Sequence, residues 1–467
     1  MDFSRISFWL VLLAALPVLL LLNALLRRSE RWCRVAHKLF ILLLSLGLLG
    51  MVSAETLCIF MAVALTAYGA CCLGVRLPAA GRKVLAAVLV PLLLLPLAYY
   101  KYAYFFGSAL LHQPWDTLRD LVIPVGISFY SFQIIGFCID TLLRGLPLPP
   151  FIDYLNFCSF FPQIVAGPIE RRHELLPQMQ TLDLRLSRAD VDAGLRYVVL
   201  GLFFKLVLAD NLAAAFTASY SGGSALHLWL NNLLFTFRIY FDFAGYALCA
   251  FGLARCMGVA LRLNFFSPYT AAHAGEFWRR WNVTLMQWFR DYIYIPLGGG
   301  RTRLWLLNVL LVFLVSGLWH GAGWNFLIWG ALAGGSVVLH RLFARCGGRL
   351  PAWLGWCLTF GFMVWVWMFF YDTDFNLLKQ HLQLLATPAA YSPAAFAHEL
   401  TAMKTSGAMA LPFVLLSFGM LLIEARSLRR YGDPYAAFLG SWSCGFMVFL
   451  MVLLVPAASS PFIYFAF

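Results

Sequence analysis

The chain has 467 residues, of which 62% are hydrophobic and 12% are charged, and its formal net charge is +13. Globular proteins average about 25% charged residues, so this composition excludes an ordinary soluble protein and predicts an all-α polytopic membrane protein. The 11 cysteines form no Cys-x-x-Cys pair, which gives no support for a zinc site or a disulfide framework.

Long apolar stretches predict about 11 to 12 membrane helices, each near the ~20 residues that a helix needs to cross a bilayer. The stretches on either side of Glu55 and of His320 are short, which favours broken or tilted helices there. In chain order the stretches are 7–26, 39–54, 56–75, 84–106, 121–142, 195–219, 227–254, 304–319, 321–340, 353–371, 407–424 and 438–456.

Lysine and arginine cluster in alternate loops, and this predicts sidedness because cations near the ends of membrane helices stay in the cytoplasm. Five cations lie within 27–38, after the first stretch, whereas only Arg5 precedes it, so we expect the amino terminus outside. The expected outer loops, 107–120, 220–226 and 372–406, are poor in cations, and an even number of helices returns the carboxyl terminus outside. The positive charge is therefore topological and does not indicate nucleic-acid binding.

The first apolar stretch is long and lacks a small-residue cleavage site, so we expect it to remain as an anchor. We expect one membrane domain, with N-terminal helices in 1–143, a core in 144–345 and C-terminal helices in 346–467. Two inner-face insertions, roughly 144–194 and 258–303, hold the densest motifs.

The first insertion contains Phe-Phe-Pro-Gln-Ile-Val-Ala-Gly-Pro-Ile-Glu-Arg at 160–171. Its two prolines and its glycine exclude a regular membrane-spanning helix. Irregular backbone at membrane depth persists only where it is buried in protein or lines a wet cavity. A structural turn is the alternative, and the residues favour neither interpretation.

The second insertion, from Glu276 to Arg301, interleaves tryptophan and tyrosine with arginine, as interfacial helices do. Most of these arginines are expected only to reach lipid headgroups. Asn282 is harder to explain as packing, because an amide both donates and accepts hydrogen bonds and needs partners among the tryptophans. The glycines at 298–300 resemble a phosphate loop only weakly, since the Lys-Ser/Thr of such a loop is missing.

His320 lies in a long uncharged segment that continues to Arg341. A titratable ring at membrane depth is costly and is usually retained for chemistry, although a hydrogen-bonded core histidine is the alternative. The preceding stretch, 304–319, rises at most about 24 Å, less than the ~30 Å hydrocarbon core. We therefore expect His320 to be recessed in the membrane, where a cytoplasmic donor and an external acceptor can reach it through opposite openings.

Four separate sequence blocks, in the same order as in the family, resemble the membrane-bound O-acyltransferases (MBOAT). The resemblance is to the branch that acts on alginate and teichoic acid. The resemblance is dense from about Pro124 to His340 and implies a ring of membrane helices, with re-entrant and interfacial helices, around a central tunnel. The blocks are Phe161–Arg171, Glu276–Arg301, Ser316–Trp329 and the tail Pro461–Phe465.

The resemblance implies that His320 is catalytic and that Asn282 occupies the family's second polar position. Close bacterial members carry histidine there, so the asparagine argues against a two-histidine relay and leaves His320 as the only candidate base. A neutral imidazole, with an ordinary pKa of about 6.5, is suited to take a proton from a hydroxyl that attacks a thioester. Asn282 would then orient the acceptor or donate to the developing oxyanion, a role worth about 3 kcal/mol.

The remaining candidate site residues are expected to bind the donor or to line a dry tunnel. The arginines are suited to the phosphates of coenzyme A. We expect no bound cofactor and no metal, with acetyl-CoA as a substrate. These candidates are Arg279, Arg280, Arg290, Arg301, Trp281, Trp319 and Trp324.

The predicted function is transfer of acetyl from a cytoplasmic thioester across the bacterial inner membrane, for O-acetylation of a secreted exopolysaccharide such as alginate or cellulose. By analogy with the family, a periplasmic SGNH-type partner completes the transfer. One alternative is D-alanyl transfer, which requires an aminoacyl carrier protein. Another is a non-enzymatic polysaccharide or lipid transporter, which the lack of an internal repeat disfavours.

Overall fold

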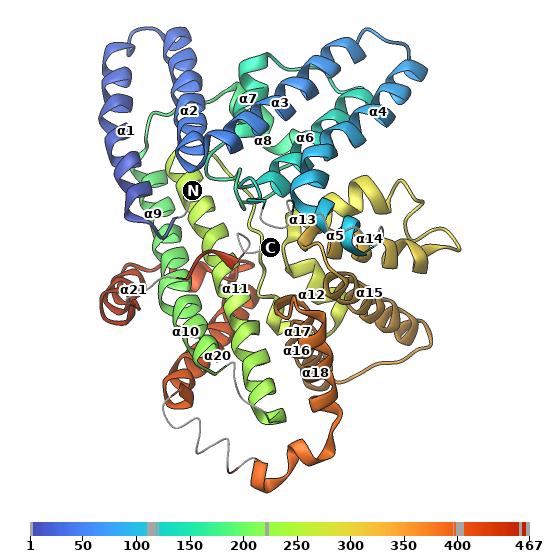
Figure 1. Ribbon diagram of the computed structural model, residues 1–467. Helices are drawn as coiled ribbons and strands as arrows, with labels where there is room; N and C mark the ends of the chain where they lie inside the picture. The colour runs from blue at the N-terminus through green and yellow to red at the C-terminus, as the bar shows by residue number, and fades with distance from the viewer. Residues whose placement is uncertain are drawn as a thin grey trace. The chain divides into compact units, whose positions relative to one another are not determined.

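The computed structural model describes residues 3–109, 118, 121–219, 224–395, 397, 406–456 and 460–463. These residues form helices joined by turns and irregular segments, with no β-strand among them (Figure 1). The prediction of an all-α polytopic membrane protein is confirmed.

Nine helices in the described ranges are long and apolar enough to cross a membrane, and three shorter apolar helices accompany them. The long ones are Ile6–Leu25, Glu30–Val52, Ala54–Gly74, Ala79–Ser108, Arg188–Phe216, Ala225–Cys256, Trp324–Arg345, Ala352–Tyr371 and Ala410–Tyr431. The shorter ones are Ile127–Leu142, Trp305–His320 and Ser441–Leu454.

The chain divides into two compact units, Met1–Val198 with Ala247–Arg262, and Val199–Tyr246 with Leu263–Phe467. The single membrane domain and the ring of helices around a tunnel stay predictions.

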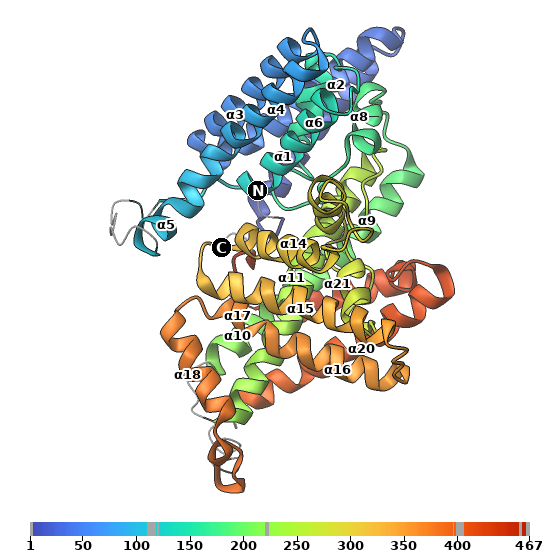
Figure 2. The same ribbon diagram turned by 90° about the vertical axis from the view of Figure 1, so that its right-hand side faces the viewer.

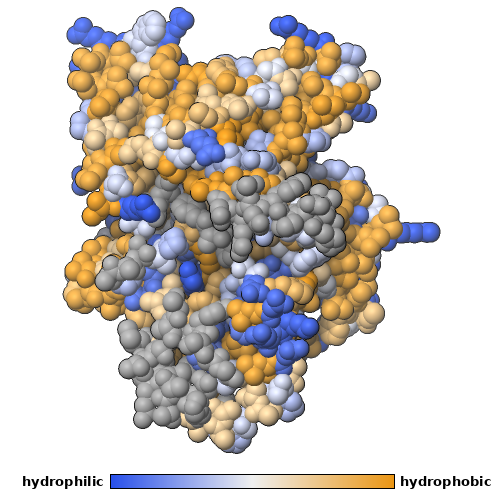
Figure 3. Space-filling model, viewed as in Figure 1, coloured by the Kyte–Doolittle hydropathy of each residue, from blue (hydrophilic) through white to orange (hydrophobic). Residues whose placement is uncertain are grey.

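The first unit is built mainly on helices near the amino terminus. Leucines such as Leu13 and Leu21 are 62% and 58% exposed, as side chains that face lipid are. Hydrophobic side chains cover most of the visible surface over α1 to α4, and hydrophilic ones gather at the helix ends (Figure 3). Its main helices are α1 (Ile6–Leu25), α2 (Glu30–Val52), α3 (Ala54–Gly74), α4 (Ala79–Leu97), α5 (Ala103–Ala109), α6 (Ile127–Leu142), α7 (Phe151–Ser159), α8 (Arg172–Gln180) and most of α9 (Arg188–Phe203).

The 160–171 block lies in this first unit and is turns and extended backbone, as its prolines predicted. Its residues are buried, and Phe161 N donates to Ser45 Oγ at 3.1 Å. Gly126 has a φ of +78°, and a Cβ there would lie 2.7 Å from Ile164 O. The block is therefore packed closely against protein, which agrees with the requirement for burial.

The second unit contains the segments with the tryptophans, Asn282 and His320. Helices α14 and α15 lie side by side in both views (Figures 1 and 2). A Cβ at Gly317 would overlap Phe326 O, and one at Gly330 would overlap Phe313 O, so glycine permits this close approach. The main helices are α10 (Asp210–Ser219), α11 (Ala225–Cys256, in part), α12 (Ala274–Arg280), α13 (Val283–Phe289), α14 (Trp305–His320), α15 (Trp324–Arg345), α16 (Ala352–Val366), α17 (Met368–Tyr371), α18 (Phe375–Ala386), α20 (Ser406–Tyr431) and α21 (Ser441–Leu454).

Candidate functional site

His320 is the last residue of α14, where Gly321 takes an extended conformation and ends the helix. The side chain is buried, with 5% of its surface exposed. Its ring centroid lies 5.1 Å from those of both Trp329 and Phe370, and 4.8 Å from that of Trp319. The imidazole therefore sits in a dry aromatic environment, which suits a neutral base.

Asn282 lies between α12 and α13 and has a left-handed backbone, with φ +41° and ψ +57°. Asparagine tolerates this conformation better than most residues that have a side chain. Only 2% of its surface is exposed, and neither the Oδ1 nor the Nδ2 atom has a hydrogen-bond partner among the described residues. A buried amide without partners marks a position where a ligand or water completes the hydrogen bonding.

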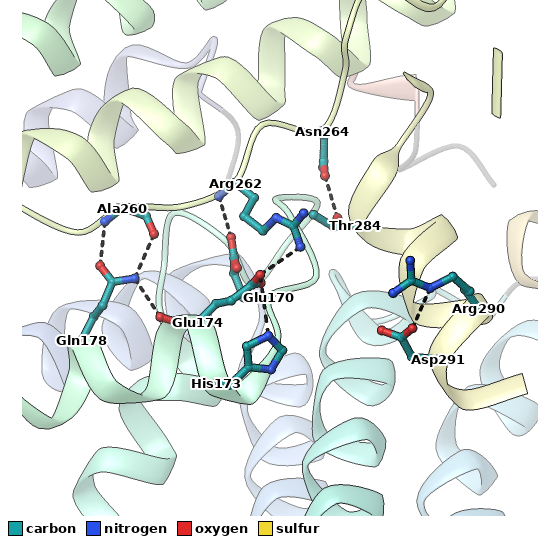
Figure 4. Close-up of polar contacts among 10 residues, drawn as sticks. All are labelled: Glu170, His173, Glu174, Gln178, Ala260, Arg262, Asn264, Thr284, Arg290 and Asp291. Carbon is teal, nitrogen blue, oxygen red and sulfur yellow. Dashed lines mark hydrogen bonds and ion pairs between the residues drawn. The ribbon is translucent and has the colours of Figure 1, made fainter. Parts of the chain in front are cut away.

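An irregular segment at 264–266 holds the backbone on both sides of Asn282. Val283 N donates to Asn264 O at 2.9 Å, and Phe266 N donates to Arg280 O at 2.9 Å. Thr284 Oγ1 also donates to Asn264 Oδ1 at 2.6 Å (Figure 4). These contacts fix the turn that keeps Asn282 in its unusual conformation.

A row of tryptophans connects the neighbour of Asn282 to His320. The ring centroids of Trp281 and Trp367 are 5.0 Å apart, those of Trp367 and Trp329 are 5.8 Å apart, and Trp329 then contacts His320. The indole N–H groups of Trp329 and Trp367 are buried and have no hydrogen-bond partner within the described part of the chain. The sequence analysis missed Trp367 and did not give Trp329 a role.

Three arginines line a cavity of about 430 Å³ beside α12, α13 and α15. They are Arg279 and Arg290, which the sequence predicted as donor-binding residues, and Arg341, which it counted only as a topological charge. The Arg341 guanidinium lies 4.4 Å from the Trp305 ring centroid. Arg290 Nε also bonds Asp291 Oδ1 at 2.8 Å (Figure 4).

The other candidates lie elsewhere in the second unit. Arg280 pairs with Glu276 Oε1 at 2.5 Å and donates to Thr270 Oγ1 at 3.0 Å, so it braces the start of α12. Arg301 is exposed, Trp324 is 48% exposed, and neither lines the arginine cavity. Trp281 and Trp319 are buried beside Asn282 and His320 respectively.

A charged cluster in the second unit also escaped the sequence analysis. Lys205 Nζ lies 2.8 Å from both Asp210 Oδ1 and Asp242 Oδ1. The tail joins this cluster, because Ser460 Oγ donates to Asp210 Oδ1 and Ile463 N donates to Asp242 Oδ2, each at 2.6 Å. Buried charges need partners, and through this network the cluster holds Ser460 and Ile463 in place. Positions 464 and 465 of the tail block lie outside the described residues.

In the first unit, Glu170 connects its loop to the segment at 260–262 (Figure 4). Its Oε1 accepts a hydrogen bond from Arg262 N at 2.7 Å, and Arg262 Nη1 pairs with Glu174 Oε1 at 2.9 Å. Burial raises the pKa of Glu170 to about 8. Across the described residues, no group of three or more His, Cys, Asp and Glu side chains is placed to hold a metal ion.

A model of the membrane-bound O-acyltransferase family matches residues 144–378, just over half of the chain. The chain belongs to the membrane-bound O-acyltransferase family. The match includes Asn282, His320 and all three cavity arginines, and it confirms the resemblance drawn from the sequence.

The relatives that the chain resembles are named for related acyl-transfer activities. The chain is 35% identical to the peptidoglycan O-acetyltransferase of Helicobacter pylori, over 59% of each chain. It is 36% identical to the probable alginate O-acetylase AlgI of Pseudomonas aeruginosa, over 64% of this chain and 59% of the relative. It is 28% identical to the teichoic acid D-alanyltransferase of Bacillus subtilis, over 52% of this chain and 63% of the relative. The matches thus span about three fifths of each relative's length.

Proposed function

We propose that the chain is an O-acetyltransferase of the bacterial inner membrane, with both termini in the periplasm, that acts for a cell-envelope or secreted polysaccharide. The relatives that act on peptidoglycan and alginate support this class of acceptor, and alginate and cellulose remain our two candidate polymers. The observation that carries the proposal is the buried Asn282 amide, which has no hydrogen-bond partner in the described part of the chain and lies one residue from the tryptophan row that ends at His320.

In this mechanism His320 is the general base. Its neutral ring takes the proton of the acceptor hydroxyl while the hydroxyl oxygen attacks the thioester carbonyl carbon. The tetrahedral intermediate collapses by breaking the carbon–sulfur bond, and the thiolate takes the proton from the imidazolium. The products are an acetyl ester and a free thiol, so every atom and electron pair is accounted for.

The side-chain N–H groups of Asn282, Trp329 and Trp367, which have no hydrogen-bond partner among the described residues, would donate to the oxyanion of the intermediate. Fixed donors in a site without water stabilise such a charge without reorganising. The surrounding aromatic rings keep water out, which limits hydrolysis of the thioester.

The arginine cavity is our proposed entrance for the donor, acetyl-CoA. Arg279, Arg290 and Arg341 gather positive charge around an opening that Trp278 and Tyr294 also line. Arginine forms bidentate hydrogen bonds with phosphates, and an aromatic ring offers a face for the adenine base. An SGNH-type periplasmic partner completes the transfer to the polymer.

The test measures thiol release and acetate incorporation in inside-out membrane vesicles that enclose the acceptor polymer and the periplasmic partner and receive [¹⁴C]acetyl-CoA from outside, on the cytoplasmic face. We expect His320→Gln, which keeps a polar side chain but loses the base, to reduce both by about 10²–10⁴-fold. Equal activity in the variant would overturn the assignment of His320. Transport of polymer without thiol release in the wild type would instead support a transporter.

D-alanyl transfer is the second candidate, supported by the Bacillus subtilis relative. The same vesicles supplied with a D-alanyl carrier protein distinguish it. Incorporation of D-alanine without incorporation of acetate would replace acetyl-CoA as the donor.

A further inference from the structure

A second cavity, of about 670 Å³, lies between α15 and α16. Leu332, Leu339 and Phe343 line it from α15, and Leu358 and Phe362 line it from α16. The spacings within each helix, multiples of three to four residues, place these side chains on one face. We call this cavity the α15–α16 groove.

The groove has an open apolar wall. Leu339 is 68% exposed, Leu358 is 57% exposed and Phe343 is 43% exposed. It uses a different face of α15 from the arginine cavity, which Val337 and Arg341 line. The groove is therefore a separate site, and its occupant does not follow from the proposed reaction.

The charged and titratable side chains that line the groove are Arg349, His340 and His273, and Ser336 and Thr359 add two hydroxyl groups. Arg349 lies in the connection between α15 and α16, His340 lies on α15, and His273 directly precedes α12. The two imidazoles stack with centroids 3.9 Å apart and planes 9° apart. No acidic residue is among the residues described as lining the groove.

The histidines supply hydrogen bonds, and the arginine supplies the permanent charge. His273 Nδ1 accepts a hydrogen bond from Glu276 N at 3.1 Å, so its Nε2 carries the proton of the neutral ring. Burial and the neighbouring His340 lower the pKa of His273, which keeps this ring neutral near pH 7. Arg349 then faces a bound group as the fixed cation.

This combination fits one class of ligand. A soluble anion makes no use of an exposed leucine and phenylalanine wall, whereas a phospholipid covers that wall with its acyl chain. A zwitterionic headgroup brings its own cation towards Arg349, and an anionic headgroup does not. We propose that the α15–α16 groove binds an anionic phospholipid, with an acyl chain on the apolar wall and the phosphate at Arg349.

The test uses native mass spectrometry of the full chain in detergent, titrated with dioleoylphosphatidylglycerol or dioleoylphosphatidylcholine. We expect the wild type to retain phosphatidylglycerol preferentially. Arg349→Ala should weaken this binding about tenfold, as expected for loss of a charge-assisted contact. Arg303→Ala is the matched control, because Arg303 is exposed and does not line the groove.

A second pair of variants tests the apolar wall without changing charge. No atom lies within 4 Å of a Cβ built at Gly335, which lines the groove, so Gly335→Leu extends a side chain into the groove from an uncrowded position. Gly361→Leu on α16 is the control, because it is equally open and lies outside the lining. We expect only Gly335→Leu to lose the bound lipid.

Three results would overturn the proposal. They are equal retention of both lipids by the wild type, wild-type affinity in both Arg349→Ala and Gly335→Leu, and full competition by glycerol 3-phosphate at lipid concentrations. The last result would identify a site for a free anion. Size-exclusion profiles identify a variant that has not folded, and the other variant of the two then decides.

Discussion

At the scale of single residues, Asn282 combines two features that are costly in a folded protein. Its backbone is left-handed, and its buried amide lacks partners among the described residues. An unsatisfied buried polar group costs about 1–3 kcal/mol. A substrate that supplies the partners explains why both costs are retained.

Two substitutions of Asn282 distinguish the contribution of its side-chain amide to activity from the contribution of its backbone conformation to stability. Asn282→Gly removes the amide but tolerates the positive φ, so we expect acetyl transfer to fall about 10²–10³-fold with little change in thermal stability. Asn282→Ala should lose the same activity and also about 1–2 kcal/mol of stability, because its Cβ disfavours this conformation. The measurements are thiol release in vesicles and thermal unfolding in detergent.

If Asn282 has only a structural role, we expect the opposite result. The Gly variant would then lose stability and keep the turnover of its folded fraction. Wild-type turnover in both variants would remove Asn282 from the proposed site and leave the oxyanion to the indole N–H groups of Trp329 and Trp367.

Glu170 predicts a pH dependence of stability in the first unit. Burial raises its pKa from an ordinary 4.5 to about 8, so the folded protein binds this proton more tightly than the unfolded chain does. The stabilisation is fully present below pH 4.5 and is lost as the pH rises through about 8. Glu170→Gln stays neutral and can still accept from Arg262 N. We expect its thermal stability to fall less than that of the wild type between pH 6 and pH 9, and parallel curves would contradict this.

Sequence reasoning selected His320 and Asn282 as candidates because a polar group stands out in an apolar or tryptophan-rich segment, and their roles stay predictions. It could not select Trp329, Trp367 or Arg341. Tryptophan and arginine are common near membrane interfaces, and only the tertiary packing distinguishes those that join the site.

At the scale of elements, the breaks in the apolar pattern were the most informative part of the sequence. Helix α3 begins at Ala54 after Ser53, whose Oγ accepts from Thr56 N, and α14 ends at His320, so helices do end close to Glu55 and at His320. Of the four stretches expected to be broken or tilted, only α14, with 16 residues, is short, whereas α2, α3 and α15 have 23, 21 and 22 residues and are long enough to cross a membrane. The sequence analysis missed α18, because its amphipathic pattern lies in a segment assigned to an outer loop. It also started the second stretch at 39, whereas α2 begins at Glu30 and carries charged residues in its first turns.

The α14–α15 pair should be sensitive to a single methyl group. Gly330→Ala places a Cβ against Phe313 O, so we expect it to lower the free energy of unfolding by about 1–3 kcal/mol through overpacking. Gly335→Ala on the same helix meets no atom within 4 Å and serves as the control. Thermal unfolding monitored by size-exclusion chromatography compares the two variants. Equal unfolding midpoints would contradict the prediction, because they would show that α14 and α15 can move apart with no loss of stability.

At the scale of the whole molecule, loop charge predicts which segments face the cytoplasm. On a cysteine-depleted background, Arg303→Cys and Arg345→Cys should resist a membrane-impermeant thiol reagent in intact cells, whereas Lys379→Cys should react. All three native side chains are exposed, so access to the reagent depends on the side of the membrane. Equal labelling of positions 303 and 379 would leave family membership intact but remove the proposed cytoplasmic donor entrance.

Composition alone predicted a helical membrane protein. A spanning segment must satisfy its own backbone hydrogen bonds in the bilayer, and an apolar helix does so. The division into two compact units did not follow from composition, since the long helix α11 belongs in part to each unit. Contacts between distant segments decide such a division, and hydropathy does not record them.

The asparagine at position 282 also has a kinetic consequence. An amide neither gains nor loses a proton in the working range, so the proposed site contains one titrating side chain, His320. The rate should therefore rise with pH along a single ionisation and then stay level, because a bell-shaped profile requires a second essential group. Placing histidine at 282 would introduce such a group and, with it, the possibility of a descending limb.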